Sequence, residues 1–447
     1  MASQRTLKIC YLGGGSRFVV TLLHGLAQVA ARLATLTDRV ELVLVDPATE
    51  RTREMAAYAE IVRACTGLPL HVQVNERWAG VLADSSLVLY SVGHHGEVVR
   101  RRRAMGPPVD GAHEESVAGM ASEAAVAWPT VATVASCIQR EAPQALFATL
   151  VNPTDVLAAA VQRRYGVRSI GLCVEVPQLV SWLAMHLGVP RHAIDLDHLG
   201  LNHCGWVGRW TVDGRDGSER LARRLQQRMA GPEWDPVCDD FASLFRHTGY
   251  LRTSAFHSWP FHQVRDEAWQ QRRQWYRSQR LYAPLNWDQF CQANLGQAMA
   301  QGRMIGEEED EEGRIHRWAM PYKYCSTRHT LGALAVGLAG GRSEAAPLQA
   351  VNGRANPVLD EDVWGEVPTV VDDGRLEPQR ATPLPGWMGE QLRLLGRQRS
   401  DLAQWLSENE PEALTRAICR WPDTVDTTAL EATVQQLHSL AQEPVAV

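Results

Sequence analysis

Residues 7–16 (LKICYLGGGS) join an apolar, strand-like run to three glycines and a serine. Apolar residues at helical spacing follow over residues 18–36, and a second β-rich run over residues 40–45 leads directly to Asp46. In such a unit the glycines let the backbone approach a pyrophosphate at the helix N-terminus, and the acid binds the adenosine ribose hydroxyls. The acid also favours NAD over NADP, because it repels a 2′-phosphate. The residues expected to contact NAD are Gly13, Gly14, Gly15, Ser16, Arg17 and Asp46.

The same alternation of strand-like and helical segments continues to about residue 170. Strand-like runs occupy residues 71–74, 86–92, 145–151 and 169–173, and helical patterns occupy residues 51–66 and 116–141. Alternating strands and helices predict right-handed βαβ units and a parallel sheet. We therefore expect an α/β protein with an N-terminal Rossmann-like, doubly wound parallel sheet in residues 1–170. Because the alternation loosens afterwards, residues 171–447 are expected to form a mixed α+β domain for substrate and metal binding and for oligomerisation.

Composition and charge narrow the classes of function. The net charge is −6 with arginines dispersed among acids, so nucleic acid is not an expected partner. No apolar run is long enough to cross a membrane, and the first residues lack the features of a signal peptide, which predicts a cytoplasmic protein. Lysine chemistry is nearly excluded, because Lys8 and Lys323 are the only two lysines of the sequence. Proton transfer then falls to His, Tyr, Glu or metal-bound water.

Three side chains stand at the expected ends of strands. Asn152 lies in residues 151–154 (VNPT), Cys173 ends residues 171–173 (GLC), and His203 lies in residues 200–206 (GLNHCGW). Ligands bind at the carboxyl ends of strands in open α/β sheets, where a thiolate and an imidazole could hold a divalent ion. By spacing alone, a lone buried cysteine or histidine is more often structural, and an asparagine at this position is also a helix cap.

These segments together resemble glycoside hydrolase family 4, the NAD- and manganese-dependent glycosidases, of which the chain is identified as a divergent member. Residues 8–16 resemble the family's opening strand and glycine-serine turn, and residues 152–153 its N-P motif. Residues 171–173 and 200–203 resemble its two metal-ligand motifs. Residues 351–359 (VNGRANPVL) and 363–368 (VWGEVP) are similar to its N-x-x-N-x-G-x-I-x-N-L-P and V-E-V-P segments.

The resemblance implies a fold of the lactate/malate dehydrogenase-like superfamily and a redox-assisted mechanism. NAD would oxidise the sugar at C3, and a manganese ion would stabilise the enediolate that forms when a tyrosine removes the C2 proton. Elimination of the leaving group, addition of water and return of the hydride would complete hydrolysis. Carried over, the metal ligands would be Cys173 and His203, and the substrate contacts Asn152, Asn202 and Glu115.

The sequence departs from the family pattern at residues that matter for proton transfer. Val174 follows Cys173, where many members have an acid or another polar residue. Residues 252–261 align with the segment that carries the family's tyrosine, and Phe261 then stands in its place. The remaining candidates for proton transfer are Glu175, Tyr250, His257 and His262.

Two further departures concern the segments that bind the dinucleotide and the sugar. Phe18 occupies the third glycine position of G-x-G-x-x-G, and the family's R-V-G-G reads SVGH at residues 91–94. The missing arginine argues against a phosphorylated sugar, because this region helps to hold the substrate in phosphosugar members.

Three hypotheses remain open at this point. The first is an NAD- and metal-dependent glycosidase. The second is a non-hydrolytic sugar epimerase or dehydrogenase, an oxidoreductase acting on a glycosylated metabolite, which the missing tyrosine and acid favour. The third is a non-catalytic NAD-binding sensor, which the retained Cys173, His203 and Asn152 argue against. A small sugar or glycoside is the expected partner, and the resemblance implies a homodimer or homotetramer with residues 259–290 as a candidate interface.

Overall fold

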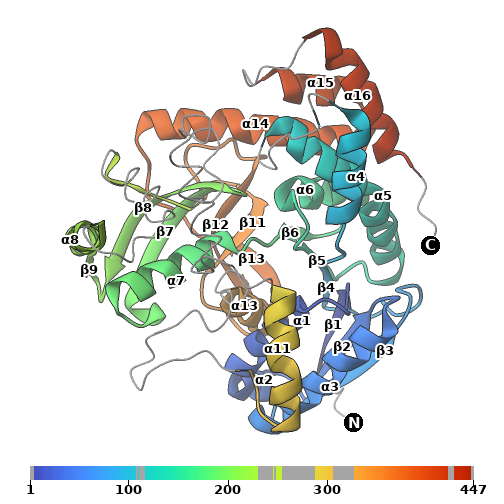
Figure 1. The fold of residues 1–447 in the computed structure, drawn as a ribbon, viewed down its shortest axis with the longest axis vertical. Coiled ribbons are helices and arrows are strands. Elements are labelled where there is room, and N and C mark those ends of the chain that lie inside the picture. The colour runs from blue at the N-terminus through green and yellow to red at the C-terminus, as the bar shows by residue number, and fades with distance from the viewer. Residues whose placement is uncertain are drawn as a thin grey trace.

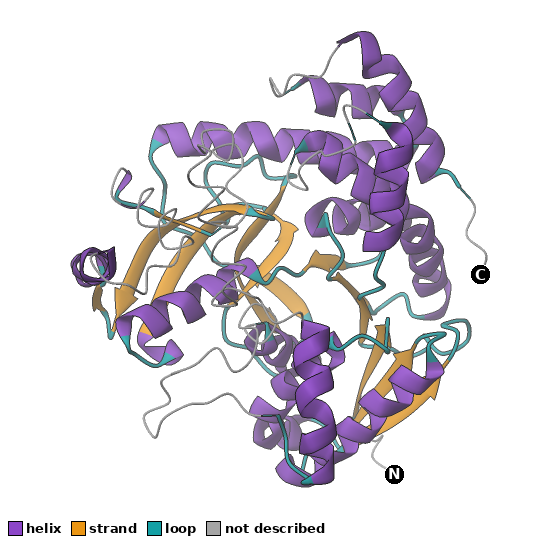
Figure 2. Ribbon diagram, in the orientation of Figure 1, coloured by secondary structure: helices purple, strands orange, loops and turns teal. Residues whose placement is uncertain are grey.

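The computed structural model of the protein describes residues 5–106, 109, 116–229, 245, 248–253, 287–305, 327–420 and 427–443. The strands of these ranges form one sheet of 13 strands, in which the order β10-β8-β7-β12-β11-β6-β5-β4-β1-β2-β3 forms the main path. Figure 1 shows the elements in chain order, and Figure 2 shows this sheet running between layers of helices.

The N-terminal half of the sheet is entirely parallel, as the alternating pattern predicts. Its strand order is 3-2-1-4-5-6, the order of dinucleotide-binding Rossmann sheets. The strands are β1 (Thr6–Leu12), β2 (Arg39–Val45), β3 (Leu70–Asn75), β4 (Leu87–Tyr90), β5 (Leu146–Thr149) and β6 (Ser169–Gly171).

Pairing becomes antiparallel beyond β6. Gly171 of β6 pairs with Gln349 of β11, and Glu366 of β12 pairs with Gly200 of β7, so the two halves share one continuous sheet. The strands of this half are β7 (Ile194–Leu201), β8 (Cys204–Val212), β9 (Arg215–Asp216), β10 (Leu251–Arg252), β11 (Ala346–Val351), β12 (Trp364–Asp372) and β13 (Arg375–Pro378). The change of pairing falls beside the expected boundary at residue 170, although the division into two domains stays a prediction.

Both faces of the parallel half are covered by helices, because alternate residues of its strands are apolar on both sides. In β1, Cys10 and Leu12 join one buried cluster, and Ile9 and Tyr11 join the other. The first cluster is covered by α4 (His95–Met105), α5 (Val117–Glu141), α6 (Thr154–Tyr165), α14 (Gly386–Glu408), α15 (Pro411–Cys419) and α16 (Thr427–Ala441). The second is covered by α1 (Phe18–Gln28), α2 (Ala30–Leu36), α3 (Thr49–Thr66), α11 (Trp287–Ala300) and α13 (Arg328–Leu338). The expectation of a doubly wound sheet is confirmed.

The remaining helices are α7 (Glu175–Leu187), the 3₁₀ turn η1 (Arg191–Ala193) and α8 (Ser218–Met229), which pack with β7 and β8. The helical pattern over residues 18–36 forms two helices, because Val29 leaves the helical conformation with φ −110° and ψ 13°. Within the described ranges no single helix is long and apolar enough to cross a membrane. Only α1 and α2 meet those criteria jointly, as a pair bent by 70°.

Candidate active site

The glycine turn closes the end of β1 against its neighbours in the sheet. Gly13 has φ +94°, and a Cβ atom there would lie 2.5 Å from the Ser91 carbonyl oxygen. A Cβ atom on Gly14 would lie 2.8 Å from the Val45 nitrogen. The backbone N–H groups of Gly13 and Gly14 both donate to the Val45 carbonyl at 2.9 Å. Only glycine fits at these two positions of the turn, and α1 begins directly after it.

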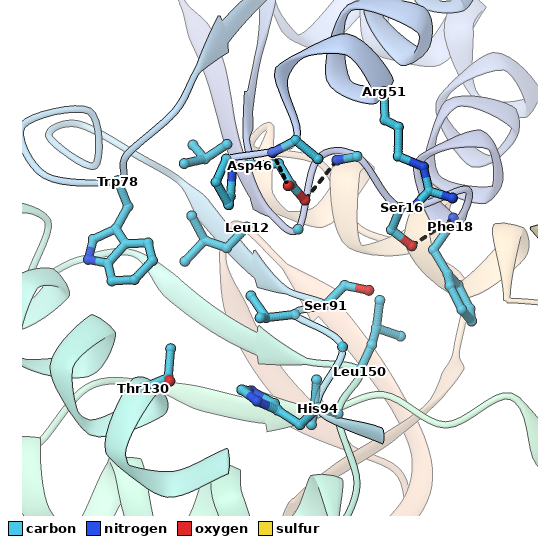
Figure 3. A pocket seen from close by; sticks show the side chains of 18 of the residues that line it. Leu12, Ser16, Phe18, Asp46, Arg51, Trp78, Ser91, His94, Thr130 and Leu150 are labelled. Carbon is cyan, nitrogen blue, oxygen red and sulfur yellow. Dashed lines mark hydrogen bonds between the residues drawn. The ribbon is translucent and has the colours of Figure 1, made fainter. Parts of the chain in front are cut away.

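A cleft of about 690 Å³ opens above the turn and is lined by Gly13, Gly15, Ser16, Phe18 and Asp46 among others (Figure 3). The Asp46 carboxylate accepts hydrogen bonds from the Gly15 N–H at 3.1 Å and from the Ala48 N–H at 2.8 Å. These bonds fix the carboxylate at the end of β2, the position from which such an acid binds ribose hydroxyls. Sequence reasoning therefore placed four of its six cofactor candidates on the wall of one cleft.

Arg17 lies elsewhere. Its guanidinium pairs with Glu54 of α3 at 2.5 Å, and its side chain is 8% exposed, so it joins α1 to α3. Gly14 belongs to the turn but does not line the cleft, because it packs against Val45 of β2. Phe18, which replaces a glycine of the usual motif, lines the cleft where α1 begins.

Several residues of the cleft wall were missed by sequence reasoning. Trp78, His94 and Thr130 face the cleft from three separate segments (Figure 3). The Tyr90 hydroxyl lies 2.7 Å from His94 Nε2 and also bonds to Thr130. Burial raises the pKa of Tyr90 and lowers the pKa of His94, so both are neutral at physiological pH. The replacement of the family's second glycine by His94 was the available signal.

The two expected metal ligands lie next to each other. Cys173 follows β6 and is buried, and His203 stands in the turn between β7 and β8 with φ 55°. Burial raises the pKa of the Cys173 thiol, and a hydrogen bond and the charge of His203 oppose that rise. A bound cation favours the thiolate in the same way, so the pair fits a divalent ion that accepts sulfur and nitrogen ligands. In the described part of the chain, no group of three or more His, Cys, Asp or Glu side chains is arranged to hold a metal.

Two buried carboxyl groups lie close to this pair. Glu175 is the first residue of α7, and Glu366 lies in β12. Burial raises the pKa of Glu366 to about 8, and the nearby Glu175 charge adds to the shift. In the sequence Glu366 stands out only as a member of residues 363–368. Its approach to Cys173 depends on strands that come together in the fold.

His198 of β7 completes the buried polar group. A β-bulge separates Asp197 from His198, and the His198 Nε2 atom lies 3.9 Å from the nearer Glu366 oxygen. Bulges re-aim side chains in this way next to functional sites. Burial lowers the pKa of His198 to about 3, so its ring is neutral at pH 7.

The two asparagines meet. The Asn202 side-chain N–H donates to Asn152 Oδ1 at 3.2 Å, and Asn152 itself lines the cleft. This contact joins the cleft to the turn that carries His203. Tyr250 packs with another group, the hydrophobic cluster of Leu199, Trp206 and Met388 under α14. Glu115, His257 and His262 lie outside the described residues.

A Rossmann sheet with a glycine turn and a strand-end acid, continued by an antiparallel half that supplies a cysteine–histidine pair, defines the chain as a dinucleotide-binding type of α/β protein. The family follows from the sequence itself. The Family 4 glycosyl hydrolase model matches residues 8–189 and the model of that family's C-terminal domain matches residues 198–408. The chain therefore belongs to glycosyl hydrolase family 4, as the sequence resemblance predicted.

Individual relatives are distant. An alpha-galactosidase of Bacillus subtilis (strain 168) is 26% identical over 134 residues, 30% of this chain and 31% of that protein, so the match spans about a third of the relative's length. A 6-phospho-beta-glucosidase of Thermotoga maritima, solved with manganese, NAD+ and glucose-6-phosphate, is 15% identical with a TM-score of 0.68 over 99% of this chain and 100% of its own.

A 6-phospho-alpha-glucosidase from gut microorganisms, solved with NAD and Mn2+, is 14% identical with a TM-score of 0.70 over 98% of both chains. At this identity the likeness shows that the whole fold is shared.

Proposed function

We propose that this protein is an NAD- and divalent-metal-dependent glycosidase that oxidises its sugar transiently. The observation that carries the proposal is the Asn202–Asn152 hydrogen bond, which joins the dinucleotide-type cleft to the turn holding His203. A sugar held at Asn152 would then reach both the cleft and the Cys173–His203 pair. Transient oxidation of a sugar needs that adjacency.

Each residue has a role in this proposal. The turn at Gly13, Gly15 and Ser16 binds the diphosphate, and Asp46 binds the adenosine ribose. When bound, NAD accepts a hydride from a sugar carbon and returns it, while a divalent ion polarises the adjacent sugar oxygen.

On the substrate side, Cys173 and His203 hold the metal, and Asn152 binds the sugar. Glu175, buried at the start of α7, is the described carboxyl group that we propose moves a proton at the sugar. Tyr250, His257 and His262 remain the other candidates for this step, and Glu115 remains a candidate substrate contact.

The substrate class is an unphosphorylated glycoside. Ser91 lines the cleft at the position of the family's arginine, and a hydroxyl group cannot neutralise a phosphate. The test is to incubate the protein with NAD, MnCl₂ and matched glycosides with and without a 6-phosphate in deuterated water, and to follow products by NMR. Release of the aglycone with deuterium at C2, from unphosphorylated sugars only, is the expected result.

A sugar epimerase or dehydrogenase is the second candidate, favoured by Val174. An apolar side chain directly after the metal cysteine cannot protonate a leaving group. In the same NMR experiment, an inverted or oxidised sugar without aglycone release would support this candidate and exclude the glycosidase.

The metal assignment has its own test. Cys173→Ser should abolish manganese-dependent turnover while NAD binding, measured by calorimetry, is retained. Cys204→Ser is a matched control, because Cys204 is equally buried but belongs to the cluster under α14. Equal manganese dependence in Cys173→Ser and wild type would show that the ligand assignment is wrong. The implied homodimer or homotetramer stays a prediction that light scattering can check.

A further inference from the structure

Four buried or cleft-lining side chains from three separate segments form one chain of hydrogen bonds. The Thr154 hydroxyl, at the start of α6, donates to Gln349 Oε1 in β11. Gln349 Nε2 donates to Asn202 Oδ1 at 3.0 Å, and Asn202 Nδ2 donates to Asn152 Oδ1 at 3.2 Å. All three bonds run in the same sense, so the chain is a polarised relay that ends at the wall of the cleft.

Gln349 is the residue that sets the direction. It stands directly opposite Glu366 in the antiparallel pair of β11 and β12, so both side chains project from the same face of the sheet. The Gln349 amide turns its N–H towards the Asn202 oxygen and accepts from the Thr154 hydroxyl with its own oxygen. Turning the amide over would place its oxygen against the Asn202 oxygen and leave that bond unmade.

The relay fixes which end of the Asn152 side-chain amide faces the cleft. Because Asn152 Oδ1 accepts the bond from Asn202, its Nδ2 amide group is the end that remains for a ligand. Amide N–H groups donate, so the cleft presents a donor at this point. A sugar hydroxyl oxygen that becomes a carbonyl oxygen is the acceptor that gains most from such a donor, because it carries negative charge once the hydroxyl proton is lost and again in the enediolate that follows oxidation.

We propose that Thr154, Gln349 and Asn202 are positioning residues which orient Asn152 as a hydrogen-bond donor to the oxygen of the sugar carbon that is oxidised. This proposal rests on the proposed function for the identity of the ligand. Asn202, predicted from the sequence as a substrate contact, acts here through Asn152. It is 4% exposed and bonded on both sides, whereas Asn152 lines the cleft.

The direction of the relay can be tested without any ligand. In Asn152→Asp the carboxylate still accepts the Asn202 N–H, so the melting temperature should stay close to that of wild type. In Gln349→Glu a carboxylate faces both the Asn202 oxygen and Glu366, so the melting temperature should fall by several degrees. Gln398→Glu is the matched control for a buried carboxylate, because the Gln398 amide is equally buried and donates to the Ala417 carbonyl far from the site.

We expect wild type and Asn152→Asp to have the highest melting temperatures, Gln398→Glu an intermediate one, and Gln349→Glu the lowest. If Asn152→Asp instead falls as far as Gln349→Glu, the relay runs in the opposite sense and the proposal is overturned. The melting temperatures test the direction of the relay even if the wild-type protein cleaves no glycoside. A wrong relay and a wrong proposed function therefore give different results.

The catalytic consequence is tested with the unphosphorylated glycosides of the NMR assay. Asn152→Asp removes the donor, and Asn202→Asp makes Asn152 turn over and present its oxygen. Both should lower kcat by about 100-fold, the loss typical of one oxyanion-stabilising donor, with a smaller change in KM and an unchanged Kd for NAD. Retention of wild-type kcat in either folded variant would contradict the proposal, whereas a purely structural role predicts loss of NAD binding and stability together.

Discussion

At the residue scale, the orientation of the Asp46 carboxylate is fixed before any ligand arrives, because two backbone N–H groups hold it. We expect Asp46→Ala to weaken NAD binding by about 10- to 100-fold, since two charge-assisted hydrogen bonds to ribose are lost. The preference for NAD over NADP should shrink, because the repulsion of a 2′-phosphate disappears. Calorimetric titration of both dinucleotides measures this, with Glu50→Ala on the exposed start of α3 as control. An unchanged NAD affinity would remove Asp46 from the cofactor site.

His198 gives a pH dependence of stability whose sign follows from burial. Its pKa falls from 6.5 to about 3 in the fold, so the unfolded chain binds the proton more readily. Stability is therefore fully present above pH 6.5 and is lost as the pH falls from 6.5 towards 3, by about 1.4 kcal/mol for each pH unit. His198→Gln should flatten this part of the profile in urea unfolding, and His71→Gln, on the exposed side of β3, should leave it intact. Identical slopes in His198→Gln and wild type would contradict the prediction.

Sequence reasoning proposed candidate site residues that follow parallel strands, and it did not single out Gln349 and Glu366, which depend on antiparallel register. Asp46, Asn152 and Cys173 each lie within three residues of the end of a strand, and the ends of parallel strands meet at one edge. Gln349 and Glu366 reach the site because β11 and β12 pair with β6 and β7, from more than a hundred residues away in the chain. No local pattern encodes that pairing.

At the scale of elements, α1 and α13 approach each other through two glycines. A Cβ atom on Gly25 would lie 2.5 Å from the Arg328 carbonyl oxygen, and one on Gly332 would lie 2.8 Å from the Gly25 carbonyl oxygen. Gly25→Ala should therefore push the helices apart and lower the free energy of unfolding by about 1–3 kcal/mol. Urea denaturation measures the effect.

Gly296→Ala in α11 is the control for this substitution. A Cβ atom there meets nothing within 4 Å, so alanine should raise stability by about 0.5–1 kcal/mol through helix propensity. If Gly25→Ala is as stable as Gly296→Ala, the close approach of α1 and α13 is not a constraint on the fold.

The helices and strands that the sequence predicted are those whose apolar pattern can be seen within a short stretch of residues. The strands of the parallel half were predicted because each apolar run ends at a turn or a polar residue. The break at Val29 was missed, because the apolar spacing continues through it. The turn that places His203 between β7 and β8 was not predicted either, although the sequence drew attention to His203 itself.

At the scale of the whole molecule, residues from both halves of the chain build the two largest cores. α13, from beyond residue 327, packs on α1, and α14 and α16 pack on α6 and α5. The Asp155–Arg399 ion pair joins α6 to α14 in a buried position. The two halves therefore share the two largest cores as well as their sheet, which the change in sequence pattern near residue 170 did not reveal.

This sharing predicts one cooperative unfolding transition for the whole chain. Removal of the C-terminal half would expose the apolar faces of α1, α5 and α6 and leave the edge of β6 unpaired, so a fragment of residues 1–170 should not reach a native fold. NAD, bound at the N-terminal half, should then protect the C-terminal half as well, with about 2.7 kcal/mol of stabilisation at a hundredfold excess over Kd.

Hydrogen exchange with and without NAD is the measurement, because it reports β8 and β12 separately from β1. Equal protection of all three strands by NAD is expected. Protection confined to β1 and its neighbours, or a folded fragment of residues 1–170, would mean that the halves are independent domains.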